Sequence, residues 1–153
     1  EEHGAEKIHI VAHSMGAIMV RWFLQCNTPP LLGRVVQLSP PNNGTALVDK
    51  FRWSWMFRKV NGPGGMMLGA QKDGFINSLK KPDFELGVVM SSKSINPVAS
   101  AFIPGRDDGR VPIESAKIDG MKDFVLVACN HHVIMKKQAA IERALSFIKN
   151  GSF

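Results

Sequence analysis

Four apolar runs rich in β-branched residues are spaced along the chain. Runs of this length and composition are typical of strands that are buried on both faces of a parallel sheet. We therefore expect four buried parallel strands, at Lys7–Ala12, Arg34–Ser39, Phe84–Met90 and Phe124–Ala128.

Two further stretches place apolar residues at helical spacing. The first, Met15–Cys26, ends at Asn27-Thr28-Pro29-Pro30 because proline cannot continue a helix. The second, Lys136–Lys149, is followed by a C-terminal cap at Asn150–Gly151. We expect one stripe of this second helix to face the core: Ala140, Ile141, Ala144, Leu145 and Ile148. Strands that alternate with helices predict an α/β fold, with a mostly parallel sheet flanked by helices.

Residues 45–83 break this alternation. Trp53 and Trp55 lie there beside cations, and Gly62-Pro63-Gly64-Gly65 follows them. We expect a helical insertion that buries its aromatic side chains against the sheet, within a single domain of residues 1–153. A cap or lid over an apolar pocket, able to touch lipid, is the functional alternative, and a lid would also bury its inner face.

A serine stands where the first apolar run gives way to the helical pattern. Ser14 has the small residues Ala12 and Gly16 two positions to either side. A serine on a sharp strand-to-helix turn projects its hydroxyl, and small neighbours allow the backbone segments to approach closely. This pattern is typical of the nucleophile elbow of serine hydrolases, and it predicts an acid and then a histidine later in the chain.

Candidates for both partners follow predicted strands, where the functional groups of parallel sheets gather. Asp108, in Asp107-Asp108-Gly109, lies in the connection that follows the third strand; we choose it as the acid, with Asp107 as the alternative. His131 follows the fourth strand, and we prefer it to His132 as the base. The order Ser14, Asp108, His131 is that of the α/β-hydrolases and differs from the chymotrypsin and subtilisin orders.

Other chemistry at these positions is less well supported. His131 and His132 are a poor metal site, because neighbouring side chains diverge and no carboxylate or cysteine stands at helical ligand spacing. Cys129 is an unlikely nucleophile, because no strand-to-helix elbow presents it and the chain order would be wrong.

Composition narrows the class of protein further. The length of 153 residues fits one domain, and the net charge of +6 comes without the basic and aromatic interleaving of a nucleic-acid module. We read this charge as a bias toward acidic substrates or anionic membrane surfaces. The two cysteines form no disulfide framework, and no signal peptide or membrane-spanning segment is visible, which favours the cytoplasm without fixing the compartment.

Several short stretches of the chain resemble the lipase and esterase type of α/β-hydrolase. The strings that carry the resemblance are Ala12-His13-Ser14-Met15-Gly16, Leu38 to Thr45, Gly62 to Gly69, Asp108-Gly109-Arg110-Val111 and Asn130-His131. The resemblance implies that Ser14 is the nucleophile, Asp108 the acid and His131 the base, with the Met15 N–H as one oxyanion-hole donor. It also implies ester hydrolysis through an acyl-enzyme, a cap at residues 45–83, a small-molecule or lipid substrate with an apolar acyl group, and no cofactor or metal.

Two departures from the family pattern qualify this expectation. Ala12 replaces the usual glycine, which is minor. The four strands would be the fifth to eighth of the family's sheet, so this chain resembles the carboxyl-terminal half and lacks the loop that gives the second oxyanion donor. We expect the open edge of the first strand to pair with a second copy or with a missing amino-terminal half. A catalytically impaired binding or assembly module, and a thioesterase or amidase on the same fold, are the alternatives.

Overall fold

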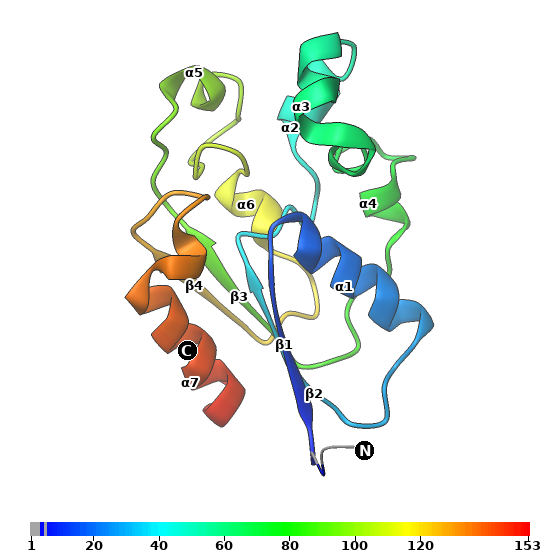
Figure 1. Ribbon diagram of the computed structural model, residues 1–153, viewed down its shortest axis with the longest axis vertical. Coiled ribbons are helices and arrows are strands. Elements are labelled where there is room, and N and C mark those ends of the chain that lie inside the picture. The colour runs from blue at the N-terminus through cyan, green and yellow to red at the C-terminus, as the bar shows by residue number, and fades with distance from the viewer. Residues whose placement is uncertain (1–3, 5) are drawn as a thin grey trace.

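A computed structural model describes residue 4 and residues 6–153 of the chain (Figure 1). Its centre is a sheet of four strands, all parallel, in the order β1-β2-β3-β4. The strands are β1 (Ile8–His13), β2 (Leu32–Leu38), β3 (Leu86–Ser91) and β4 (Asp123–Val127). The expected α/β class and parallel sheet are therefore confirmed.

Helices cover both faces of this sheet. On one face α7 (Gln138–Asn150) packs against β2 and β3, where Phe147 joins Val36 and Val89 in a buried cluster. On the other face lie α1 (Met15–Cys26) and the short α6 (Ile113–Ala116), which share a second cluster with Val35, Leu86 and Val88. Neighbouring residues of β2 thus point into opposite cores, as a two-sided strand requires.

The first strand is more exposed than its sequence suggests. β1 is an edge strand, and Ile8 and Val11 each expose 48% of their surface, so the expectation of a buried strand at Lys7–Ala12 is wrong. The physical reason is position, because β1 has β2 on one side only and α7 covers β2 and β3. The expectation of an unpaired edge on this strand holds within residues 4 and 6–153.

The last helix buries only part of the expected stripe. Ala140 and Ala144 are buried and Ile148 packs against the same cluster, as expected. Ile141 and Leu145 are 40% and 48% exposed, and Phe147 is fully buried instead. A side-chain carbon added to Gly87 of β3 would lie 2.7 Å from Phe147 Cδ2. The bare glycine therefore makes room for the Phe147 ring and sets the rotation of the helix.

The insertion at residues 45–83 is helical, with α2 (Ala46–Phe51), α3 (Trp55–Met66) and α4 (Phe75–Ser78). Gly62, at φ 65°, kinks α3 just before Pro63. Trp53 and Trp55 are 84% and 72% exposed, so the expectation that the insertion buries its aromatic side chains is wrong for both tryptophans.

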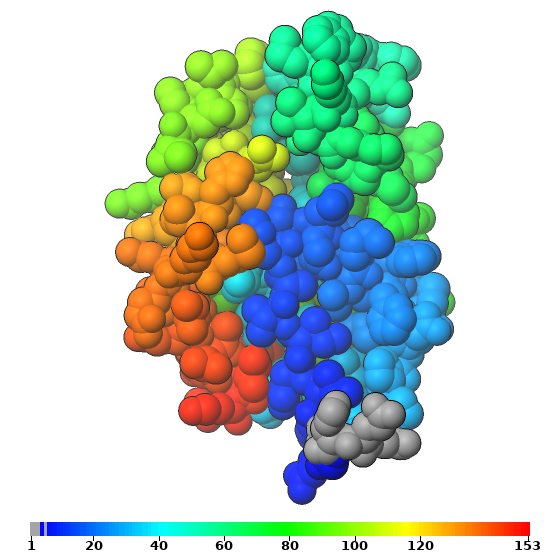
Figure 2. Space-filling model, viewed as in Figure 1, coloured from blue at the N-terminus to red at the C-terminus, as the bar shows by residue number. Residues whose placement is uncertain are grey.

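The insertion and a second short helix stand above the carboxyl edge of the sheet (Figure 1). This helix, α5 (Pro97–Ser100), follows β3, and the 3₁₀ turn η1 (Ile134–Lys136) follows β4. In Figure 2 the α2–α3 part and the α5 part lie next to each other at the upper end of the molecule, and the Phe51 and Phe102 rings join them, 5.2 Å apart between centroids. In the described part of the chain, each helix is too short or too polar to cross a bilayer.

Candidate active site

Ser14 occupies the sharp turn between β1 and α1. Its backbone has φ 50° and ψ −123°, a conformation that non-glycine residues rarely adopt, and its N–H donates to the Leu38 carbonyl at 2.9 Å. The turn presents the Ser14 side chain at the carboxyl edge of the sheet. At Gly16, however, an added side-chain carbon would meet no atom within 4 Å among the described residues, so the crowding expected there is absent.

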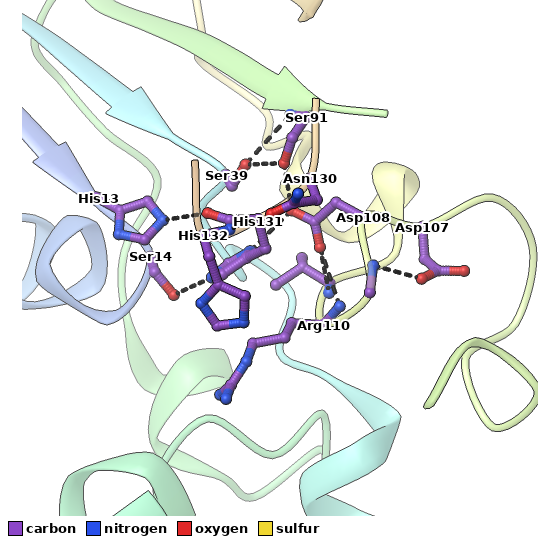
Figure 3. A network of polar contacts seen from close by, with 12 residues as sticks. His13, Ser14, Ser39, Ser91, Asp107, Asp108, Arg110, Asn130, His131 and His132 are labelled. Atoms are coloured by element: carbon purple, nitrogen blue, oxygen red, sulfur yellow. Dashed lines mark hydrogen bonds and ion pairs between the residues drawn. The ribbon is translucent and has the colours of Figure 1, made fainter. Parts of the chain in front are cut away.

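His131 follows β4 and lies against Ser14 (Figure 3). Its Nε2 is 2.9 Å from Ser14 Oγ, and its Nδ1 is 2.8 Å from Asp108 Oδ2. Only 3% of the histidine is exposed. Because an ionised carboxylate only accepts hydrogen bonds, the proton of the neutral imidazole sits on Nδ1 and leaves Nε2 free to accept the Ser14 hydroxyl.

Asp108 lies in the long connection between β3 and α6 and is almost fully buried, with 1% exposed. Oδ1 accepts hydrogen bonds from the Arg110 and Val111 N–H groups, and Oδ2 accepts from Ser91 Oγ and His131 Nδ1. Burial raises the pKa of this carboxyl, but the hydrogen bonds from His131, Ser91 and the Val111 N–H outweigh burial and hold the pKa below its usual value. Asp108 is therefore a carboxylate with four donors around it.

The structure separates the chosen residues from their alternatives. Asp107 accepts hydrogen bonds from Ser100 Oγ and the Gly109 N–H, and in Figure 3 its carboxylate points away from His131. His132 is exposed, whereas the Cys129 thiol is buried and its pKa is raised by desolvation, so it lacks the character of a nucleophile. The expected set Ser14, Asp108 and His131 is brought together in one hydrogen-bonded chain.

Two buried serines that the sequence analysis missed extend this chain behind Asp108. Ser91 ends β3 and donates to Asp108 Oδ2 at 2.6 Å, and Ser39, just after β2, lies 2.6 Å from it, oxygen to oxygen. Neither serine is exposed, and Ser39 has a positive φ of 46°. Each serine carries the first hydroxyl at the carboxyl end of a buried apolar run. Because functional side chains gather at that end of parallel strands, this position in the sequence could have identified both serines as candidates.

His13, directly before Ser14, is a third residue that the sequence analysis did not assign. Its Nε2 donates to the His131 carbonyl at 3.0 Å, and the two rings lie 4.9 Å apart between centroids. Burial lowers the pKa of His13, and the neighbouring His131 lowers it further. A neutral His13 therefore ties the backbone of His131 to the elbow.

The backbone beside Ser14 offers a hydrogen-bond donor for a developing anion. Met15 is the first residue of α1, and the first N–H groups of a helix have no partner within that helix. The positive end of the helix dipole also points there. The Met15 N–H therefore lies at the start of α1, directly after the serine.

An apolar pocket opens above Ser14 and His131, between the insertion and α5. Its volume is about 470 Å³. The side chains on its walls are mainly aliphatic and aromatic, among them Leu47, Val48, Phe51, Phe57, Leu68, Val98 and Phe102. Within the described residues, no three His, Cys, Asp or Glu side chains gather into a set that could hold a metal ion.

Comparisons with known proteins bear on the fold. The chain superposes on the lipase BlEst2 of Bacillus licheniformis in its mature form with a TM-score of 0.70 over 97% of this chain, at 16% sequence identity. It superposes on the phospholipase PlaB of Legionella pneumophila with a TM-score of 0.60 over 90% of this chain, at 14% identity. The chain has the α/β-hydrolase fold.

Likeness in sequence is weaker than likeness in fold. No family model matches the sequence. A triacylglycerol lipase of Pseudomonas fragi is 26% identical over 76 residues, which are 50% of this chain and 26% of that lipase. The chain covers 66% of the length of BlEst2 and 42% of PlaB, so it spans only part of each protein it resembles.

Within this α/β-hydrolase fold, the three side chains come from three separate connections. Ser14 follows β1, Asp108 lies in the connection after β3, and His131 follows β4. Parallel strands bring these connections to one edge of the sheet, which is where such folds place their ligands.

Proposed function

We propose that this protein is a serine hydrolase that cleaves carboxylic esters through an acyl-enzyme. The observation that carries the proposal is the chain of hydrogen bonds from Ser14 Oγ through His131 to Asp108, at 2.9 and 2.8 Å, under an apolar pocket. A hydroxyl, an imidazole and a carboxylate in this order form a nucleophile, a general base and the group that orients the base.

The reaction proceeds in two halves. Ser14 Oγ attacks the ester carbonyl carbon while His131 Nε2 takes the serine proton, and Asp108 stabilises the imidazolium that forms. The carbonyl oxygen becomes an anion and accepts from the Met15 N–H. His131 then gives the proton to the leaving alcohol, which departs as the carbon–oxygen bond breaks. In the second half, water attacks the acyl-Ser14 carbonyl and His131 again takes and returns a proton.

The pocket walls support a substrate with an apolar acyl group. Leu47, Val48, Phe51 and Phe57 come from the insertion, which we propose acts as a cap within a single domain, and Phe102 follows α5. Such walls favour transfer of an alkyl chain from water. An ester of this kind, a small molecule or a lipid, is the substrate class that we propose.

The exposed end of the cap supports contact with a lipid surface. Trp53 and Trp55 expose most of their area, and Lys50, Arg52 and Arg58 lie beside them in the sequence. Aromatic side chains next to cations are suited to the headgroup region of an anionic membrane. We propose a transient contact there that brings the pocket to its substrate.

A second oxyanion donor is the missing part of this proposal. Loss of one such donor typically costs about 10²–10³ in kcat. We propose that the donor is supplied by a segment, from a second copy or from an amino-terminal half, that pairs along the edge of β1 left unpaired within residues 4 and 6–153. The exposed apolar side chains of α1 support such a partner: Met15, Met19, Trp22 and Phe23.

Hydrolysis of p-nitrophenyl esters tests the proposed function. We expect turnover by the parent chain, with an increase from short to medium acyl chains, and loss of turnover to the blank rate in Ser14→Ala and His131→Ala. Ser92→Ala is the matched control, since Ser92 Oγ only donates to the Val127 carbonyl. Equal rates for the parent and Ser14→Ala would refute the enzyme and favour a binding module. A thioester or amide series would separate the other hydrolase chemistries.

A further inference from the structure

The wall of the pocket above Ser14 includes a positively charged side chain, Arg110, that the proposed reaction does not use. Among the described residues that line the pocket, Arg110 is the one side chain with a permanent charge, and none of them is a carboxylate residue. The other walls are mainly apolar. A guanidinium at the wall of such a pocket is a specificity feature that an alkyl ester alone does not require.

The charge of Arg110 is not neutralised by a neighbour. In residues 4 and 6–153, the ion pairs involve Arg34, Lys81, Lys117, Lys122 and His131, and none includes Arg110. Its guanidinium donates a single long hydrogen bond, of 3.4 Å, to Asn61 Oδ1 of α3. The neutral Asn61 leaves most of the five guanidinium donors free for a ligand.

The backbone holds Arg110 in place beside the candidate active site. The Arg110 N–H donates to Asp108 Oδ1 at 3.1 Å, so the Arg110 backbone is fixed in the loop that carries Asp108, the partner of His131. In Figure 3 its side chain leaves that loop, passes close to His132 and extends toward the ribbon of the insertion. Its positive charge is felt by His132, whose pKa is lowered first by burial and then by Arg110.

We propose that Arg110 binds an anionic group on the alcohol part of the substrate, so that the preferred ester joins an apolar acyl chain to an alcohol bearing a phosphate or carboxylate. This inference rests on the proposed ester hydrolysis. The acyl chain packs against the apolar walls of the pocket. The alcohol part of the ester stays near water, where it faces the exposed guanidinium. A planar guanidinium matches the two oxygens of such a group.

Paired esters test this assignment. Hexanoyl glycerol phosphate and neutral hexanoyl glycerol differ only in the anionic group, and an ester of hexanoic acid with a hydroxycarboxylic acid separates carboxylate from phosphate. We expect Arg110→Gln to lower kcat/KM for the anionic ester, relative to the neutral one, by about tenfold, the range of a charge-assisted hydrogen bond at an exposed site. The change should lie in KM, be partly rescued in Arg110→Lys, and weaken with added salt.

Arg106→Gln is the matched control. Arg106 is an exposed arginine of the same loop that does not line the pocket, so the change in net charge is identical. If Arg106→Gln lowers the ratio of kcat/KM for the anionic ester to kcat/KM for the neutral ester as much as Arg110→Gln does, the effect is a long-range field and the inference is overturned. The inference is also overturned if Arg110→Gln lowers kcat/KM equally for both esters, because that result is expected from loss of the Asn61 contact to the insertion.

Binding to a variant without turnover separates this inference from the proposed function. In Ser14→Ala, hexanoyl glycerol phosphate should bind more tightly than hexanoyl glycerol by calorimetry, and the added Arg110→Gln change should remove the difference. If the parent hydrolyses neither ester yet this difference appears, the proposed function fails and the anion site stands. If both esters are hydrolysed in a Ser14-dependent way but the difference is absent, the anion site fails alone.

Discussion

Removal of the Ser91 hydroxyl tests the buried hydrogen bond that this group donates to Asp108. Ser91 Oγ donates to Asp108 Oδ2 at 2.6 Å, and Ser91 and Asp108 are both buried. In Ser91→Ala the carboxylate keeps its donors from His131, Arg110 and Val111. Ser39 Oγ still accepts from the residue 91 N–H, at 3.2 Å in the parent, but its own O–H loses the Ser91 oxygen as acceptor, which adds a cost that does not depend on pH.

The expected loss follows from charge and burial. A hydrogen bond to a charged group contributes about 1.5–3 kcal/mol, and we expect Ser91→Ala to lower the free energy of unfolding by about 2 kcal/mol at neutral pH. Burial raises the pKa of Asp108, and the bonds from His131 and Ser91 lower it by more, so the folded-state pKa is depressed. A depressed pKa gives stability that is present above the unfolded carboxyl pKa of about 3.9 and is lost as the pH falls through the folded value.

Urea denaturation of the parent and Ser91→Ala at pH 7 and near pH 3 measures this effect. The deficit of Ser91→Ala should be largest at pH 7 and shrink at the lower pH, because protonation of Asp108 removes the charged acceptor. Ser92→Ala is the control, since its hydroxyl donates to the neutral Val127 carbonyl at 3.2 Å. We expect a deficit of about 1 kcal/mol there, equal at both pH values. A Ser91→Ala deficit that does not change with pH would refute the reasoning.

Three further expectations concern packing and surfaces. Phe147→Ala should lower the free energy of unfolding by about 3–5 kcal/mol, measured by urea denaturation, because the ring is fully buried against the sheet. Replacing Trp53 and Trp55 by serine should weaken co-sedimentation with anionic vesicles and leave hydrolysis of a soluble ester unchanged; unchanged sedimentation contradicts the lipid contact. The chain should self-associate in light scattering, and Val11→Lys on the exposed strand should reduce this; a monodisperse parent monomer with freely exchanging β1 amides contradicts pairing between copies.

Local patterns in the sequence were sufficient to predict the parallel sheet and the meeting of three side chains. Ser14, Asp108 and His131 each follow an apolar run, and parallel strands must deliver such positions to one edge. Chain order then separated Ser14 from Cys129 as the candidate nucleophile. No distant contact was needed for either inference.

What the sequence did not reveal depends on contacts between distant segments. The rotation of α7 depends on the space above Gly87, which Phe147 fills, and no helical periodicity contains that information. The exposure of Val11 depends on β1 being an edge strand, and a run of apolar residues reads the same at an edge as in the centre. Ser91 supports Asp108 only because β3 ends beneath the connection that carries the carboxylate.

The most direct measurement is the site of reaction with a fluorophosphonate, read by mass spectrometry of the labelled peptide. We predict one adduct, on Ser14, that disappears in His131→Ala and slows in Asp108→Asn, while the strained but buried Ser39 stays unlabelled. A parent chain that is folded and yet carries no adduct on Ser14, or carries it equally without His131, would contradict the proposed nucleophile and its activation.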